Sequence, residues 1–388
     1  MEQLKYQLLK ATSIKGTSTE EIEAALVHVT ETGFKPTLAI IFLSITQDRK
    51  AIWSLLDKNN IQVFGVTSNG EFIDETPAKQ SIAILLLDIN PANFKILHAD
   101  YSSNNFREVA YNLAAETIQS FSNPAFLIGG SHSNTDAELL LRGIADATSP
   151  QVDVYGCMAG DDITFTDQYV FTTNWESNKG MVMLAFDADK IIIKGKATCG
   201  WKAVGTVKTV TKSEGNHVYT VDDVPVLDLT AKYGGIENVS PENTGLLLEI
   251  AANLPLQLQR EKGDPVMRPG LVIDWTDRSF YCSGTVPQGS KVRFSLPPDF
   301  DVIERVIKSA EDMKANEMPE ADALVVFSCA GRLLSFGPMI SQEIEGIKNV
   351  WKVPMVGMFS NAELGRATGG ELEMHNETTC IVVLKERD

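Results

Sequence analysis

Two octapeptides, Gly65-Val-Thr-Ser-Asn-Gly-Glu-Phe72 and Gly357-Met-Phe-Ser-Asn-Ala-Glu-Leu364, share one pattern near opposite ends of the 388-residue chain. Each follows a short apolar run, at 61–64 or 353–356, that is typical of a buried strand. A buried strand does not require a polar Ser-Asn-x-Glu cluster, so the end of each strand is a place to look for function. The repetition also predicts that the two ends of the chain fold alike.

Each octapeptide belongs to a longer unit of strand, helix, strand, loop and strand. The N-terminal unit is expected to have strands at 37–44, 61–66 and 81–87 and a helix at 47–58. The C-terminal unit is expected to have strands at 323–328, 353–358 and 379–384 and a helix at 339–348. A weaker third unit lies between them, with strands at 125–128, 152–157 and 180–186. There a capping box, Thr135-Asp-Ala-Glu138, begins the helix, and Ala159-Gly-Asp-Asp162 replaces the Ser-Asn-x-Glu cluster.

The remaining segments complete an α+β protein. Helical spacing of apolar residues predicts a helix after Ser18 and further helices over 107–120 and 302–313, whereas 191–296 is expected to be mostly β. We therefore predict two lobes with mixed β-sheets flanked by helices, built on an internal β-α-β-β repeat. The expected domains are 1–200 and 201–388.

The composition limits the classes of partner. Asp and Glu number 51 against 34 Lys and Arg, which gives a formal net charge of −17. Such a field repels phosphate backbones and anionic lipid heads, so nucleic-acid and membrane roles are not expected. No apolar stretch has the length of a bilayer span, and the five cysteines are scattered without a C-x-x-C pair. These features predict free thiols in a protein of the reducing cytoplasm.

Several segments together resemble one family. They are 200–216 with Val221-Asp-Asp-Val-Pro225, then Phe327-Ser-Cys-Ala-Gly-Arg332, Val353-Pro-Met-Val-Gly357, Ala362-Glu-Leu-Gly365 and His375-Asn-Glu-Thr378. In order and spacing these segments are similar to FIST sensory domains. The likeness covers nearly the whole chain, as a FIST N half and a FIST C half.

The resemblance implies a ligand-sensing module, for which amino acids are the proposed ligands. Some bacterial members bind haem and respond to nitric oxide, and eukaryotic members carry an F-box. Nothing in this chain is left over for an F-box or a catalytic output domain, so the resemblance implies a stand-alone sensor with a separate signalling partner. Asn361-Ala362 departs from the aromatic residue and glycine that many members have before the glutamate.

The two polar clusters are the first candidates for ligand binding. They comprise Ser68, Asn69 and Glu71, and Ser360, Asn361 and Glu363. A glutamate suits an ammonium group, and Asn and Ser can donate hydrogen bonds to a carboxylate. In the alternative interpretation, Asn and Glu cap a turn and the start of a helix, and so lock the geometry of the unit.

Three further residues extend the C-terminal candidate site. Arg332 offers a planar donor fork to a ligand carboxylate, or alternatively forms a structural ion pair with an acidic residue such as Glu363. Cys329 is expected to be a small buried residue rather than a nucleophile, because no Cys-His spacing supports catalysis. Asn376 lies in a turn just before the last predicted strand.

Other chemistries have weaker support. His132 is the histidine best placed to ligate haem, but a single histidine without a second ligand nearby is usually a hydrogen-bonding loop residue. Asp161 and Asp162 need further oxygen ligands before they can hold a divalent cation. P-loop, dinucleotide-binding, zinc-protease and nucleophile-elbow motifs do not occur.

The sequence thus predicts a cytoplasmic small-molecule sensor that binds an amino acid or a similar zwitterion between its lobes. Arg332 is expected to pair with the ligand carboxylate, and Glu363 or Glu71 with the amine. No catalytic residue, metal or cofactor is expected. A haem-dependent nitric-oxide sensor that uses His132 is the alternative, and an enzyme that uses Cys329 or a carboxylate pair is the third hypothesis.

Overall fold

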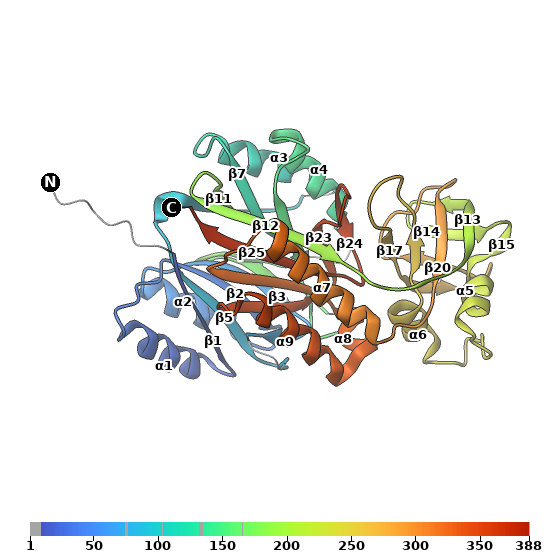
Figure 1. The fold of residues 1–388 in the computed structure, drawn as a ribbon, viewed down its shortest axis with the longest axis horizontal. Helices are drawn as coiled ribbons and strands as arrows, with labels where there is room; N and C mark the ends of the chain where they lie inside the picture. Colours follow the sequence, from blue (N-terminus) through green and yellow to red (C-terminus); the bar gives the residue numbers. More distant parts are fainter. Residues whose placement is uncertain (1–8, 74–76, 103, 132–134, 165, 388) are drawn as a thin grey trace.

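A computed structural model describes residues 9–73, 77–102, 104–131, 135–164 and 166–387 (Figure 1). The chain forms a larger body of three β-sheets with outer helices, and a smaller β-rich domain beside it (Figure 1). The predicted fold class, α+β with mixed sheets flanked by helices, is therefore confirmed.

Three sheets in the larger body share one order of strands. The first is β1 (Lys10–Gly16), β5 (Ile82–Asp88), β2 (Leu38–Ser44), β3 (Gln62–Ser68), β9 (Val170–Phe171) and β10 (Glu176–Ser177). The second is β6 (Phe94–Asp100), β11 (Gly180–Asp187), β7 (Pro124–Gly130), β8 (Val154–Met158), β23 (Ala362–Arg366) and β24 (Leu372–His375). The third is β12 (Ile191–Thr198), β25 (Thr379–Glu386), β21 (Ala323–Cys329), β22 (Met355–Ser360) and β4 (Glu71–Phe72).

Each sheet is extended by a short strand from another unit. β4 follows β3 in the chain but pairs with β22, and β23 follows β22 but pairs with β8. β9 follows β8 but pairs with β3, which closes the cycle. The three units therefore interlock through the segments that follow their second parallel strands. A common origin of the units by duplication stays a prediction.

Both faces of these sheets carry apolar residues, and both faces are buried. The inner faces meet in one central core, where the rings of Phe42 and Phe327 pack edge to face at 5.6 Å. The outer faces are covered by α1 (Thr19–Thr30), α2 (Arg49–Lys58), α3 (Phe106–Thr117), α4 (Ala137–Ala147), α7 (Phe300–Asn316), α8 (Ala330–Phe336) and α9 (Ile340–Trp351). Burial on both faces explains why strands such as β2 and β21 are continuously apolar.

The smaller domain has its own core. Its strands are β13 (Ala203–Glu214), β14 (His217–Val221), β15 (Val224–Pro225), β16 (Leu256–Leu258), β17 (Val266–Arg268), β18 (Gly270–Asp274), β19 (Ser279–Cys282) and β20 (Lys291–Ser295). Two helices complete it, α5 (Val226–Gly234) and α6 (Leu246–Asn253). The chain enters and leaves at one place, because the amide of Leu296 donates to the carbonyl of Lys202 at 2.9 Å.

The predicted domains 1–200 and 201–388 stay a prediction, and the smaller domain, from β13 to β20, lies within the second of these ranges. Residues after the smaller domain return to the larger body, where β25 pairs with β12 along eight residue pairs and with β21.

The capping-box prediction for the start of α4 was wrong in detail. The N-cap of α4 is Asp136, whose side chain accepts from the amide of Leu139, and Thr135 instead donates to the carbonyl of Ser131.

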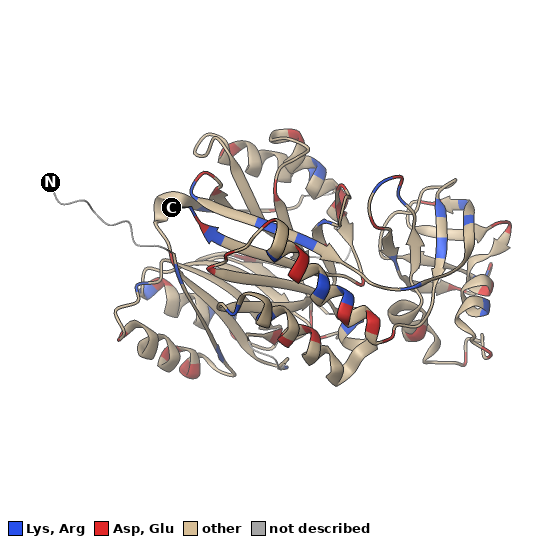
Figure 2. Cartoon of the chain, in the orientation of Figure 1, with Lys and Arg blue, Asp and Glu red and all other residues tan. Residues whose placement is uncertain are grey.

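Charges of both signs are mixed over the outer helices and the smaller domain, whereas the strands inside the larger body carry few (Figure 2). In the described part of the chain, no helix combines the length and the apolar character that a bilayer crossing requires.

Candidate functional site

The turns after β3, β8 and β22 meet in the larger body. The amide of Asn69 donates to the carbonyl of Phe359 at 2.8 Å, and the amide of Asn361 donates to that of Met158 at 3.1 Å. The amide of Gly160 donates to the carbonyl of Thr67 at 2.8 Å, so each of the three turns is hydrogen-bonded to the other two. We call residues 67–71, 158–162 and 359–363 the central ring. The two predicted polar clusters are therefore brought together, along with the Ala159-Gly-Asp-Asp162 segment.

The asparagine side chains join the turns of the ring. Asn69 Nδ2 donates to Asn361 Oδ1 at 2.9 Å, and Asn361 Nδ2 donates to the carbonyl of Ala159 at 2.8 Å. Asn69 Oδ1 accepts from the amides of Asp161 and Ile163, each at 3.0 Å. These contacts lock the turns, as the alternative interpretation of the clusters holds. They also explain Gly160, because a Cβ there would lie 2.6 Å from Asn69 Cγ.

The two glutamates of the clusters are buried and hydrogen-bonded. Glu71 accepts from the hydroxyls of Ser68 and Ser81, and Glu363 accepts from Ser360 Oγ at 2.7 Å and Thr378 Oγ1 at 2.9 Å. Burial raises the pKa of Glu71 to about 7 and that of Glu363 to about 8. Both groups can therefore hold or release a proton near neutral pH.

Glu377, which the sequence analysis did not single out, is the buried carboxyl that lacks a full set of partners. Among the described residues its Oε2 atom has no hydrogen-bond partner. Its backbone has a φ of 55°, in the left-handed region that is unfavourable for glutamate. The carboxyl lies against Gly331, where a Cβ would be 2.1 Å from Glu377 Oε1. No residue-level signal predicts this; the His375-Asn-Glu-Thr378 segment was noted only as part of the family resemblance.

Glu363 and Glu377 lie near one another. Burial raises the pKa of Glu377 well above its usual range, and the neighbouring Glu363 carboxylate raises it further. Burial and then these same two carboxylates also raise the pKa of the Cys329 thiol. Cys329 is therefore a buried neutral thiol beside the two acids, and its environment does not activate it as a nucleophile.

Arg332 is buried and bound within the protein. Its guanidinium forms an ion pair with Glu343, which also accepts from Thr379 Oγ1 at 2.6 Å. The carbonyls of Cys199 and Glu377 accept from Arg332 Nη1 at 2.9 and 3.2 Å. A structural ion pair was the alternative expected for Arg332, although with Glu363 as the suggested partner. The structure places Glu343 there instead.

The smaller domain contacts Asn376, the residue before Glu377 in the chain. Ser283 Oγ donates to Asn376 Oδ1 at 2.6 Å, and Asn376 Nδ2 reaches the carbonyl of Asn361 at 3.4 Å. We call Glu363, Asn376 and Glu377, with Ser283 opposite them, the acidic seam. The Asn361 residue at its edge is exposed.

Two partly buried ion pairs link the two domains beside the seam. Arg268 contacts Glu138 of α4 at 3.2 Å and donates to the carbonyl of Met374 at 3.1 Å. Arg260 pairs with Glu373 of β24, its Nε lying 2.8 Å from Glu373 Oε1. These contacts link the smaller domain to α4 and to β24.

The remaining candidates from the sequence are His132 and the pair Asp161 and Asp162 of the central ring. His132 lies outside the described residues. Asp161 accepts from the amide of Thr166 at 2.7 Å, and Asp162 accepts from the hydroxyl of Ser44, so protein donors already serve both carboxylates. Neither has the further oxygen ligands that a cation requires in the contacts of the described residues.

A hollow of about 550 Å³ lies at the other end of these strands from the central ring, beside the residues that precede β7 and β8. Its lining includes Ile118, Asp153, Lys194 and Arg387, and none of the predicted site residues. Asp153 there is already paired with Lys194 at 2.7 Å. We place the candidate site at the acidic seam because the buried acids converge there, and size alone does not identify a site.

Comparisons with known proteins agree with the sequence motifs. The FIST N domain model matches residues 37–224, and the FIST C domain model matches residues 233–366. No curated protein matches the chain. A crystal structure of a cyanuric acid hydrolase from A. caulinodans aligns over 98% of this chain and 100% of its own, with 6% identity and a TM-score of 0.37. That score is too low to establish a shared fold or activity. Because the two domain models together cover most of the chain, the protein belongs to the FIST family.

Proposed function

We propose that this protein is a small-molecule sensor whose ligand presents an amino group to Glu363 and Glu377 at the acidic seam. FIST domains are associated with sensory roles in signal transduction. The observation that carries the proposal is the buried Oε2 atom of Glu377, which has no partner among the described residues. Native proteins seldom leave such an atom unsatisfied, and a functional role is one of the recognised reasons for it.

An ammonium group fits the chemistry of the seam. It supplies three donors and a positive charge, so it satisfies Glu377 Oε2 and favours the ionised forms of both acids. Because the pKa of Glu363 is about 8, binding of a cation near neutral pH releases protons from the seam. We assign the ligand carboxylate to the amide of Asn376, whose Nδ2 atom makes a long contact of 3.4 Å with the Asn361 carbonyl. This assignment replaces Arg332, whose donors are directed to Glu343 and two carbonyls.

In this proposal, ligand binding changes the arrangement of the smaller domain relative to the larger body. A ligand that reaches Glu377 must displace or join the contact between Ser283 and Asn376, which crosses from one domain to the other. A ligand with different affinities for the closed and open arrangements shifts the balance between them. A separate protein then reads the altered surface. We place this signalling in the cytoplasm, since all five cysteines are free thiols.

Titration calorimetry with a panel of amino acids and simple amines tests the proposal. Measurements at pH 7 in two buffers that differ in ionisation enthalpy are expected to show binding with proton release. Glu377→Gln is expected to weaken binding at least tenfold. Glu71→Gln is the matched control, because Glu71 is also buried but has two hydroxyl donors. Absence of binding across the panel at millimolar concentration, or equal weakening by both variants, overturns the proposal.

Haem binding receives no support from the described residues. His375 is buried with Nε2 3.2 Å from the carbonyl of Gly365, and His98 is stacked on Trp175 at 4.3 Å. The hollow beside β7 and β8 is lined by neither histidine nor cysteine. His132 lies outside the described residues.

A further inference from the structure

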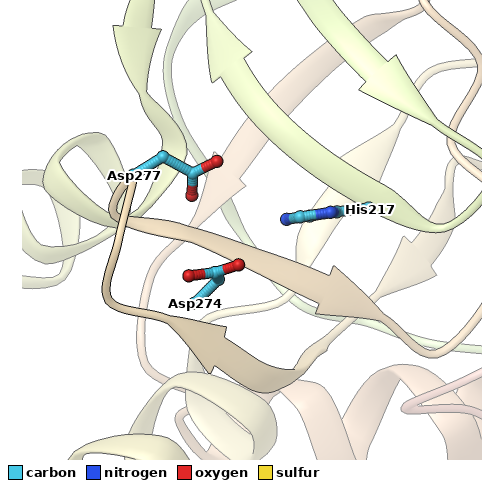
Figure 3. Close-up of side chains that lie close together, drawn as sticks. All are labelled: His217, Asp274 and Asp277. Atoms are coloured by element: carbon cyan, nitrogen blue, oxygen red, sulfur yellow. The ribbon is translucent and has the colours of Figure 1, made fainter.

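Three side chains with metal-binding atoms converge in the smaller domain, away from the acidic seam. His217 begins β14, Asp274 ends β18, and Asp277 lies in the turn that leads to β19. One ligand atom from each lies within 4.8 Å of the other two. Figure 3 shows both carboxylates directed toward the same edge of the His217 imidazole. We propose that His217, Asp274 and Asp277 bind a divalent transition-metal ion of the Mn²⁺ to Zn²⁺ series.

The imidazole is held in place by its neighbours. The His217 ring is stacked on Tyr281 at 3.9 Å and packs against Tyr219, also at 3.9 Å. His217 is buried, and its Nε2 atom lies 2.6 Å from Ser279 Oγ. Two aromatic neighbours restrict rotation of the ring, so the ligand atom is oriented before an ion arrives. Such orientation of a metal ligand by surrounding groups raises metal affinity.

The local backbone brings the two carboxylates together. Asp274 and Asp277 flank a tight turn in which Asp274 Oδ1 accepts from the amide of Thr276 at 2.9 Å. Arg278, the next residue, has a φ of 58° and pairs with Asp228 of α5, so its charge is directed to another partner. The turn therefore presents two carboxyl groups to the imidazole without a competing cation from Arg278.

The ligand types select the class of ion. One imidazole and two carboxylates suit Zn²⁺, Mn²⁺ or Fe²⁺, whereas Mg²⁺ and Ca²⁺ prefer oxygen alone. A zinc ion lies about 2.0 to 2.2 Å from such ligands. Side-chain rotation must therefore bring the three ligand atoms closer together than the 4.8 Å within which they now lie. Asp277 is exposed and Asp274 is half-buried, which leaves room for ion entry and for water as a further ligand. Ser279 Oγ, which donates to Asp277, would orient that carboxylate.

Cobalt substitution tests the site in the full-length protein. Chelator-treated protein is titrated with Co²⁺ and the visible absorption is recorded, followed by competition with Zn²⁺. We expect one bound equivalent, displacement by Zn²⁺, and no thiolate charge-transfer band. His217→Gln and Asp277→Asn are expected to weaken binding at least tenfold. Asp277→Asn changes an exposed turn residue, so it preserves the fold if His217→Gln does not.

Matched controls separate the site from general metal binding. His98→Gln changes an exposed histidine of the larger body, and Asp223→Asn changes an exposed turn residue of the smaller domain. Both are expected to bind Co²⁺ as the unmodified protein does. The proposal is overturned if the unmodified protein retains no ion, if the two ligand variants bind as tightly as the controls, or if a thiolate band reports cysteine ligation.

Discussion

At the residue scale, three buried glutamates differ in how their carboxyl groups are satisfied. Hydroxyl groups donate to Glu71 and Glu363, whereas Glu377 has an unfavourable backbone conformation and an oxygen without a partner among the described residues. Strain and unsatisfied polar atoms reduce stability, and proteins concentrate them at functional sites. Glu377 is therefore expected to lower stability in the absence of a ligand.

Replacement of Glu377 by asparagine tests that expectation. Asparagine tolerates left-handed backbone and removes the buried carboxyl, so we expect the free energy of unfolding to rise by about 1 kcal/mol. Urea denaturation measures the change, and ligand binding is expected to be lost in the same variant. Glu371→Asn, at an exposed position, is the control and is expected to be nearly neutral. A less stable Glu377→Asn protein would contradict the interpretation.

The raised pKa values of Glu71 and Glu363, about 7 and about 8, predict a pH dependence of stability. The folded protein retains these two protons above the unfolded pKa of about 4.3, so their contribution is complete below that pH and is lost as pH rises. Each group lowers the free energy of unfolding by up to about 1.4 kcal/mol per pH unit until its folded pKa is reached. Urea denaturation at intervals from about pH 5 to pH 8 is expected to show a shallower decline in Glu363→Gln. An unchanged slope would show that Glu363 is ionised throughout.

The Arg332–Glu343 pair is expected to be structural. Arg332→Met leaves Glu343 buried without its cation, and loss of one partner from a buried pair costs about 3–5 kcal/mol. The double variant Arg332→Met/Glu343→Leu is expected to recover part of that loss in urea denaturation. A single variant close to the unmodified protein in stability would indicate that the pair contributes little.

At the scale of elements, the exchanged strands explain the glycine that begins each octapeptide. Gly357 of β22 is paired with Phe72 of β4, and Gly65 of β3 is paired with Phe171 of β9. A Cβ at these glycines would lie 2.1 Å from the Phe72 ring and 2.2 Å from the Phe171 ring. The aromatic residue occupies the space that a side chain on its partner strand would need.

Gly357→Ala tests this packing. The added methyl group must displace the Phe72 ring, and overpacking of this kind typically costs about 1–3 kcal/mol. Gly370→Ala is the control, because its nearest neighbours are 3.4 Å or more from the added atom. Thermal and urea unfolding are expected to show the loss in Gly357→Ala alone. Combination with Phe72→Leu is expected to restore part of the stability, and equal stability of both alanine variants would contradict the model.

At the scale of the whole molecule, the smaller domain is an insertion whose ends lie together. Ala203 pairs with Ser295 at the point where the chain enters and leaves the domain. The three sheets of the larger body are completed by residues before and after this segment, including the pairing of β12 with β25. The larger body is therefore expected to fold without it.

Excision of residues 203–296, with a short Gly-Ser linker in their place, tests this independence. We expect a folded protein with one cooperative urea transition and a smaller m-value, since less surface is exposed on unfolding. The excised protein is also expected to lose the proposed metal binding, because its three ligands lie in the removed segment. Aggregation or a non-cooperative transition would show that the larger body depends on the domain contacts.

Much of the fold was accessible from local patterns. Continuous apolar runs predicted β2, β3, β5, β21 and β25 to within a few residues, because strands buried on both faces need apolar side chains throughout. The short strands β4, β9 and β23 and the helices α5 and α6 were not predicted. β4 and β9 contain two residues each, too few for a periodic signal, and they are stabilised by partners from other units.

Apolar runs in the sequence locate the buried strands and show that a polar turn follows two of them. Which turns meet depends on long-range packing, because the contact between Asn69 and Asn361 joins residues 292 positions apart. The tertiary structure likewise pairs Arg332 with Glu343 and leaves one oxygen of Glu377 without a partner in the described part of the chain. Side-chain periodicity reflects burial within one element, whereas hydrogen-bond partners depend on how strands from different units are exchanged between sheets.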